Sequence, residues 1–185
     1  SYKTAIADAL KKNIFVNTIH CGDEEIGVRD YWKDAALRGN GKFFNINADA
    51  TVRAIKTPFD PQIILCNNKL NDTYISYGST GRERKMNQIA QDKNAGTISS
   101  ANYAERAVSK SGSAYKNTSW DLVDKMKEDQ NVLSSIKKDE LPQELQNKST
   151  EEIKSIITQK EKERTAIQKE IAELAIKRQA YIEEQ

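Results

Sequence analysis

The sequence predicts an α/β segment followed by a mainly α-helical extension that ends in one long helix. Residues 14–46 contain a β-prone run, a stretch with apolar residues at helical spacing and a second β-prone run. This is the pattern of two parallel strands joined by a crossover helix. After residue 48, helical stretches separated by Pro, Gly and Ser replace the strands. We therefore divide the chain into residues 1–48, 49–148 and 149–185.

The first segment is predicted to hold two helices and two strands. A short amphipathic helix opens it, because Ile6, Ala9 and Leu10 share one helical face. Gly39 and Gly41 end the crossover helix before the second strand. The predicted elements are a helix over 2–12, a strand over 14–20, a helix over 26–38 and a strand over 42–46.

The rest of the chain is predicted to be helical. Pro58, Pro61 and Pro142 mark breaks, and short helices are expected over 61–75, 82–95, 101–110 and 120–126. Ser149 precedes Glu151 and Glu152, a typical beginning for the long last helix. Its apolar stripe is interrupted by Lys160 and Arg164. Packing on the preceding helices and an intermolecular coiled coil both remain open interpretations.

Residues 13–47 contain sequence motifs that are similar to those of a known protein family. They read N-I-F-V-N-T-I-H-C-G at 13–22, Y-W-K-D-A-A at 31–36 and G-N-G-K-F-F-N-I-N at 39–47. This resembles the last part of a von Willebrand factor A (VWA) domain. L-N-D-T-Y-I-S-Y-G, S-W-D-L-V-D and L-P-Q-E-L, further along, resemble tails of bacterial VWA-like proteins thought to be exported. The fold class implied is α/β: the last strands and helices of a Rossmann-like VWA sheet, followed by a mainly α-helical extension.

The resemblance implies a non-catalytic protein-binding or adhesion-type module in an exported bacterial protein that is periplasmic, a lipoprotein or secreted. The family holds a divalent cation with an Asp-x-Ser-x-Ser loop, and none of the 185 residues forms that motif. We therefore expect no cofactor in this chain and a divalent cation only in a full-length parent. The implied partner is a protein ligand or the missing N-terminal half of the domain. Self-association is an alternative, as is a structural role in which the long C-terminal helix docks partners.

Composition excludes some classes of function. Hydrophobic residues make up 37% of the chain and charged residues 30%, and the net charge is +2, so the chain as a whole does not favour a polyanionic partner. No apolar run reaches the roughly 20 residues that span a bilayer, and no signal peptide is visible. Cys21 and Cys66 are expected as either a disulfide or two buried thiols.

A ligand crevice is one candidate site. His20 follows a predicted parallel strand, and Asp23 and Glu24 come just after it. Carboxyl ends of parallel strands are where α/β proteins bind ligands. The alternatives are a loop histidine and acids that stabilise the start of the next helix. A single His and the lack of a nucleophile motif argue against an enzyme.

Two further candidates lie in the extension. Arg82, Arg84 and Lys85 follow Gly78-Ser79-Thr80-Gly81 and could contact an anion at a helix N-terminus. The spacing matches no known nucleic-acid reader, so nucleic acid is not the favoured partner. Trp120 lies in a short amphipathic helix and is either buried against the long helix or exposed as a partner contact.

Overall fold

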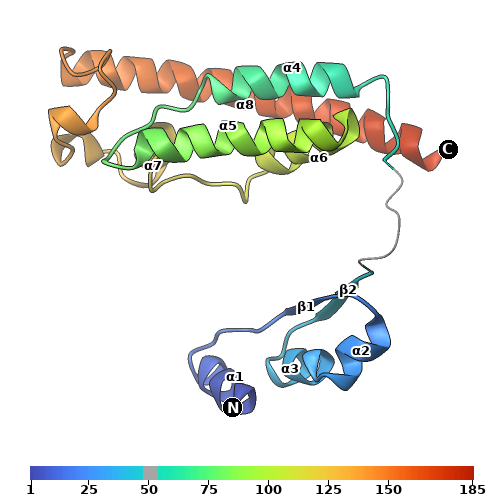
Figure 1. The fold of residues 1–185 in the computed structure, drawn as a ribbon. Coiled ribbons are helices and arrows are strands. Elements are labelled where there is room, and N and C mark those ends of the chain that lie inside the picture. The colour runs from blue at the N-terminus through green and yellow to red at the C-terminus, as the bar shows by residue number, and fades with distance from the viewer. Residues whose placement is uncertain (48–53) are drawn as a thin grey trace. The chain divides into compact units, whose positions relative to one another are not determined.

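A computed structural model describes residues 1–47 and 54–185 of the chain. It divides the chain into two compact units, Ser1–Arg53 and Ala54–Gln185, and each is treated by itself below. Figure 1 shows the elements of both units.

The described part of the first unit, residues 1–47, forms three helices and two short strands. β1 and β2 pair in parallel, with Thr18 opposite Phe43 and Cys21 opposite Ile46. The elements are α1 (Tyr2–Lys11), β1 (Thr18–Cys21), α2 (Glu24–Arg29), α3 (Trp32–Arg38) and β2 (Phe43–Ile46).

Local backbone chemistry explains where these elements end. The predicted helix over 26–38 is two helices, because Tyr31 has φ 68°, a left-handed conformation that an α-helix cannot contain. The turn into β2 passes so close to β1 that a Cβ on Gly41 would collide with the carbonyl of Val16. Glycine is therefore required at position 41 for the two strands to pair.

The second unit is a bundle of helices. Its elements are α4 (Asp60–Asn71), α5 (Gly81–Ile98), α6 (Ser100–Ser111), α7 (Leu122–Glu128), the 3-10 helices η1 (Val132–Ser134) and η2 (Lys138–Glu140), and α8 (Thr150–Glu183). α8 packs along α4, α6 and α7, and its 34 residues make it about 50 Å long. Ser149 and Glu152 form a capping box at its start, where the sequence predicts the helix to begin.

Two hydrophobic clusters form the core of this unit. One joins α4, α6 and α8 around Leu70, Trp120 and Ile171, and the other joins α7 to the first turns of α8 around Leu122 and Ile157. Cys66 is buried in the first cluster, and both cysteines are free thiols. The apolar stripe of α8 is therefore used within the unit.

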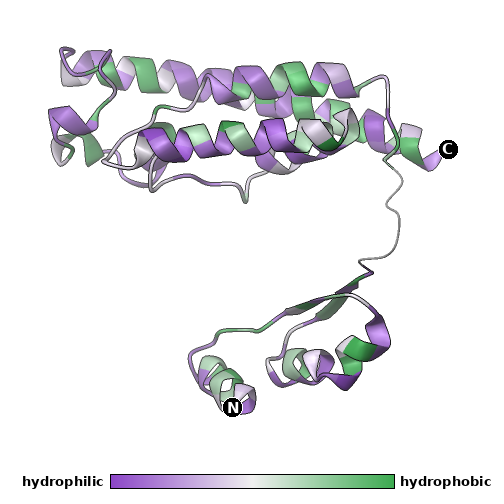
Figure 2. Ribbon diagram, viewed as in Figure 1, coloured by the Kyte–Doolittle hydropathy of each residue, from purple (hydrophilic) through white to green (hydrophobic). Residues whose placement is uncertain are grey.

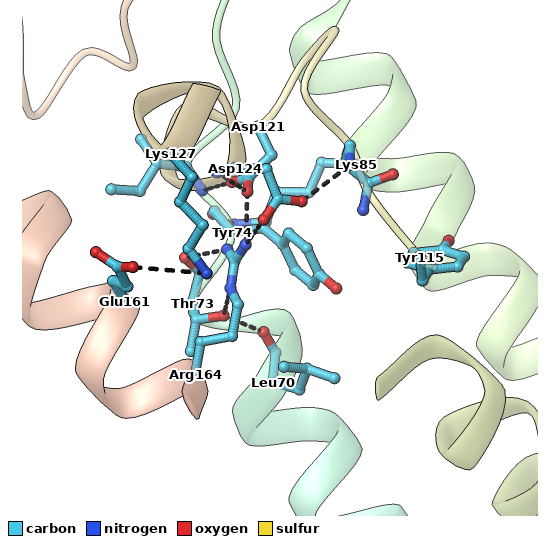
Figure 3. Close-up of polar contacts among 12 residues, drawn as sticks. Leu70, Thr73, Tyr74, Lys85, Tyr115, Asp121, Asp124, Lys127, Glu161 and Arg164 are labelled. Carbon is cyan, nitrogen blue, oxygen red and sulfur yellow. Dashed lines mark hydrogen bonds and ion pairs between the residues drawn. The ribbon is translucent and has the colours of Figure 1, made fainter. Parts of the chain in front are cut away.

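Arg164, which seemed to interrupt that stripe, is 1% exposed and lies inside the unit. Its guanidinium donates to Asp121 Oδ2 at 2.7 Å and Asp124 Oδ1 at 2.8 Å, and to the side chain and carbonyl oxygens of Thr73 at 2.9 Å each. It also stacks over the Tyr74 ring at 4.2 Å (Figure 3). A buried charge is tolerated when it is paired and its hydrogen bonds are satisfied, as here.

The predicted fold class is wrong. Among the residues that the structure describes, 63% are helical, in eight α-helices and two short 3-10 helices, and the one sheet has only two strands. This does not fit a Rossmann-like VWA sheet with a helical extension. The parallel pairing of β1 with β2 is as expected, but a strand–helix–strand pattern specifies only a local pair. It carries no information on how many further strands join that pair.

Candidate functional site

The two faces of the β1–β2 sheet have opposite character. The helices α1, α2 and α3 lie on one side of it, and the other side carries no helix or strand formed by residues 1–47 (Figure 1). Because successive residues of a strand point to opposite faces, each strand contributes two residues to each side. Thr18, His20, Phe43 and Asn45 face the helices and are buried or half-buried.

Polar groups on the helix-covered side satisfy each other. Thr18 donates its hydroxyl to the Trp32 carbonyl at 2.8 Å. His20 Nδ1 and Asn45 Oδ1 lie 2.8 Å apart, and Asn45 Nδ2 donates to the Gly22 carbonyl at 3.0 Å. A Cβ on Gly27 would stand only 2.7 Å from the His20 ring, so α2 packs directly on this histidine.

The uncovered side is apolar. We call Ile19, Cys21, Phe44 and Ile46 the open sheet face. Ile19 is 54% exposed, Phe44 50% and Ile46 55%, and Cys21 is exposed as well. Figure 2 shows hydrophobic residues on both strands. The open sheet face is thus the more hydrophobic side of the sheet, yet it is the side that faces solvent.

This distribution is the reverse of the usual one. Parallel sheets are normally covered on both faces, and apolar residues normally lie on the covered side. Within residues 1–47, neither strand pairs with a third, so both strand edges are also free. An exposed apolar face with free edges is typical of a surface that binds another polypeptide.

The predicted ligand crevice does not assemble. His20 lies beneath α2 with one ring nitrogen held by Asn45. Asp23 caps α2, its Oδ1 accepting from the Ile26 amide at 3.1 Å, and Glu24 lies in the first turn of that helix. The two acids thus have the helix-stabilising role that was the alternative interpretation. Among the described residues, no group of three His, Cys, Asp or Glu side chains is placed to hold a metal ion.

The three predicted anion contacts lie at the start of α5 and diverge. Arg82 is exposed beside the loop that holds η2, and Arg84 donates Nε to the Thr80 hydroxyl at 3.2 Å. Lys85 is half-buried and donates Nζ to the Tyr74 carbonyl at 2.6 Å (Figure 3). Successive positions on a helix are rotated by about 100°, so the three groups cannot surround one anion.

Trp120 is buried in the core of the second unit. Its ring lies 5.5 Å from the Tyr74 ring, and its carbonyl accepts from the Tyr77 amide at 2.8 Å. This is a packing role, and it leaves no exposed indole for a partner.

No residue of the open sheet face was among the site residues predicted from the sequence. The signal that could have found it is the period-two alternation of apolar residues with Thr, His and Asn in the two strands. Sequence alone does not say which of the two sides the helices cover.

Comparison with known protein families, with curated proteins and with solved structures finds no match for this chain. Among the described residues, no helix has the length and hydrophobicity needed to cross a membrane.

Proposed function

We propose that residues 1–47 form a non-catalytic docking module that binds a partner protein through the open sheet face. The observation that supports this most is the reversed burial: Ile19, Phe44 and Ile46 are half-exposed while Thr18 and Asn45 face the helices. Leaving apolar side chains in water opposes folding, whereas burying them at an interface is favourable.

The proposed occupant is one amphipathic α-helix of the partner. Helices are the elements that cover the faces of parallel sheets. Two neighbouring strands lie about 4.8 Å apart, and a helix with its side chains is about 10 Å wide, so one helix covers the pair. The open sheet face carries no charged residue, so the side of the helix that contacts it must be apolar.

The small size of the open sheet face indicates a transient complex. Burying the exposed half of a large apolar side chain contributes roughly 1 kcal/mol. Ile19, Phe44 and Ile46 together therefore supply only about the energy of a millimolar complex. Ile14 and Phe15 are also exposed just before β1.

The long C-terminal helix is less suited to docking. Ile153, Ile157 and Ile171 are buried within the second unit, and among the described large hydrophobics of α8 only Ile176 is exposed. The export to an extracytoplasmic location and the cation of a full-length parent, both inferred from the resemblance, stay predictions.

A site-specific cross-link tests the proposal. Phe44→p-benzoylphenylalanine, irradiated in the cells that make the protein, is expected to link to one partner, through a peptide that forms an amphipathic helix. Leu37→p-benzoylphenylalanine is the control, because Leu37 is exposed in the same unit but lies on α3, away from the open sheet face. With the purified partner, Phe44→Ser should weaken binding about fivefold, the equivalent of roughly 1 kcal/mol, and Leu37→Ser should not.

Three outcomes would contradict the proposal. Cross-links of equal yield at positions 37 and 44 would show that the partner does not bind preferentially at the open sheet face. A link only between two copies of this chain would replace the partner by self-association. An unchanged affinity of the Phe44→Ser variant would place the contact elsewhere.

A further inference from the structure

A second feature is a cavity of about 260 Å³ in the helical unit, well away in sequence from the sheet. Its walls come from the segment between α4 and α5, from α5 itself, from the loop before α8 and from α8. Ile75, Leu145 and Ile156 provide an apolar lining. Binding cavities commonly combine such a lining with a few polar groups that orient the ligand.

Three lysines from three different elements line the same cavity: Lys85 of α5, Lys148 of the preceding loop and Lys160 of α8. All three are partly buried. Asp72 and Glu144 are the acidic residues of the lining, so the lining residues themselves sum to one excess positive charge.

The ammonium groups keep donors for a ligand. The Lys85 ammonium donates one of its three N–H groups to the Tyr74 carbonyl at 2.6 Å (Figure 3), which leaves two for a ligand. Lys160 pairs with Glu163 at 3.0 Å, whereas Lys148 makes no hydrogen bond or ion pair through its ammonium with any residue that the structure describes.

The electrostatics of Lys85 agree with an anion site. Burial lowers the pKa of Lys85, against the opposing effects of Asp72, Asp121 and Glu144, and repulsion from Lys160 adds a smaller lowering. A bound anion would relieve both the desolvation and the repulsion.

We propose that this cavity binds a small monocarboxylate with an apolar tail, its carboxylate held by Lys85 and Lys148 and its tail against Ile75, Leu145 and Ile156. The single excess charge fits a monoanion, because Asp72 and Glu144 would repel a dianion such as phosphate. The volume lies just below the roughly 300–1,000 Å³ of cavities that take drug-sized molecules, which limits the ligand to a short chain.

Titration of the full chain with octanoate tests the proposal, by calorimetry and by amide NMR shifts. Acetate supplies the charge without the tail, and 1-octanol the tail without the charge. Octanoate is expected to bind at one site and to shift the amide resonances of Ile75, Leu145 and Ile156. It should bind at least about tenfold more tightly than either acetate or 1-octanol.

Two variants locate the carboxylate. Lys85→Met and Lys148→Met should each weaken octanoate about tenfold, the effect of losing one charged hydrogen bond. Lys93→Met, at an exposed position of the same helix α5, should leave affinity unchanged. The Lys148 ammonium makes no hydrogen bond or ion pair with the described residues and interacts with Glu152 only through its charge, so its variant remains informative if Lys85→Met fails to fold.

The proposal is overturned if octanoate binds no more tightly than acetate, or if the amide resonances that it shifts belong to residues outside the cavity. It is equally overturned if the folded Lys148→Met variant binds octanoate as tightly as Lys93→Met does.

Discussion

Replacing Arg164 with methionine should destabilise the helical unit severely. The guanidinium makes four hydrogen bonds of 2.7–2.9 Å, two of them to carboxylates. Asp121, its principal partner, is fully buried. Methionine fills much of the volume but leaves the Asp121 carboxylate without its counter-ion, and breaking a buried pair in this way costs about 3–5 kcal/mol. Whole domains are stable by only about 5–15 kcal/mol.

Urea unfolding followed by circular dichroism at 222 nm measures the effect, because most helix lies in α4–α8. A loss of about 4 kcal/mol corresponds to a fall of about 2 M in the urea midpoint at a slope of about 2 kcal/mol/M. The slope itself should not change, since the surface exposed on unfolding is nearly the same.

Lys127→Met is the matched control. Lys127 and Glu161 also join α7 to α8, with 3.7 Å between Nζ and Oε1, but both side chains are more than 40% exposed (Figure 3). Exposed pairs contribute about 0–1 kcal/mol. Equal midpoints for the Arg164→Met and Lys127→Met variants would refute the reasoning. So would an Arg164→Met loss below about 1 kcal/mol, because burial would then not decide the energy of the pair.

Two further predictions concern the stability of the fold at low pH and the turn before β2. Burial acts to raise the pKa of Asp92, but hydrogen bonds from Lys110 and Asn71 outweigh it and hold the pKa below its usual range. The ionised carboxylate therefore stabilises the fold above its unfolded pKa of about 4, and this stability is lost as the pH falls further. Urea midpoints between pH 6 and pH 3 should fall more steeply for the wild type than for Asp92→Asn, and parallel profiles would contradict this. Gly41→Ala should destabilise the first unit by at least about 2 kcal/mol, because the new Cβ would collide with the Val16 carbonyl. Amide exchange should accelerate in β1 and β2 but not in α4–α8, and unchanged protection of the strands would show that the turn can relax.

Several elements could be predicted because their signals are local. The helices from α4 to α8 follow from apolar spacing, prolines and caps, and Ser149 with Glu152 marks the start of α8 as expected. The break at Tyr31 could not be predicted, because an aromatic residue gives no sign that it will adopt a left-handed conformation.

Contacts between residues far apart in the sequence explain the other features that could not be predicted. Arg164 looked like an interruption of an apolar stripe, and only its contacts with Thr73 and Asp121, far away in sequence, make its burial favourable. The sequence groups Lys85 with Arg82 and Arg84, and gives no sign that Lys148 and Lys160 lie near it. The three lysines line one cavity only because α5, the loop and α8 meet there.

The sequence by itself determined the local elements: two β-prone runs that pair in parallel, a series of helices and a long capped helix at the end. Hydrogen-bonding pattern, side-chain period and caps act over a few residues, so they are legible without a structure. Tertiary structure alone decided that the sheet stops at two strands within the described residues, which of its faces the helices cover, and which charges are buried. These depend on contacts between distant segments, whose energies no local pattern encodes.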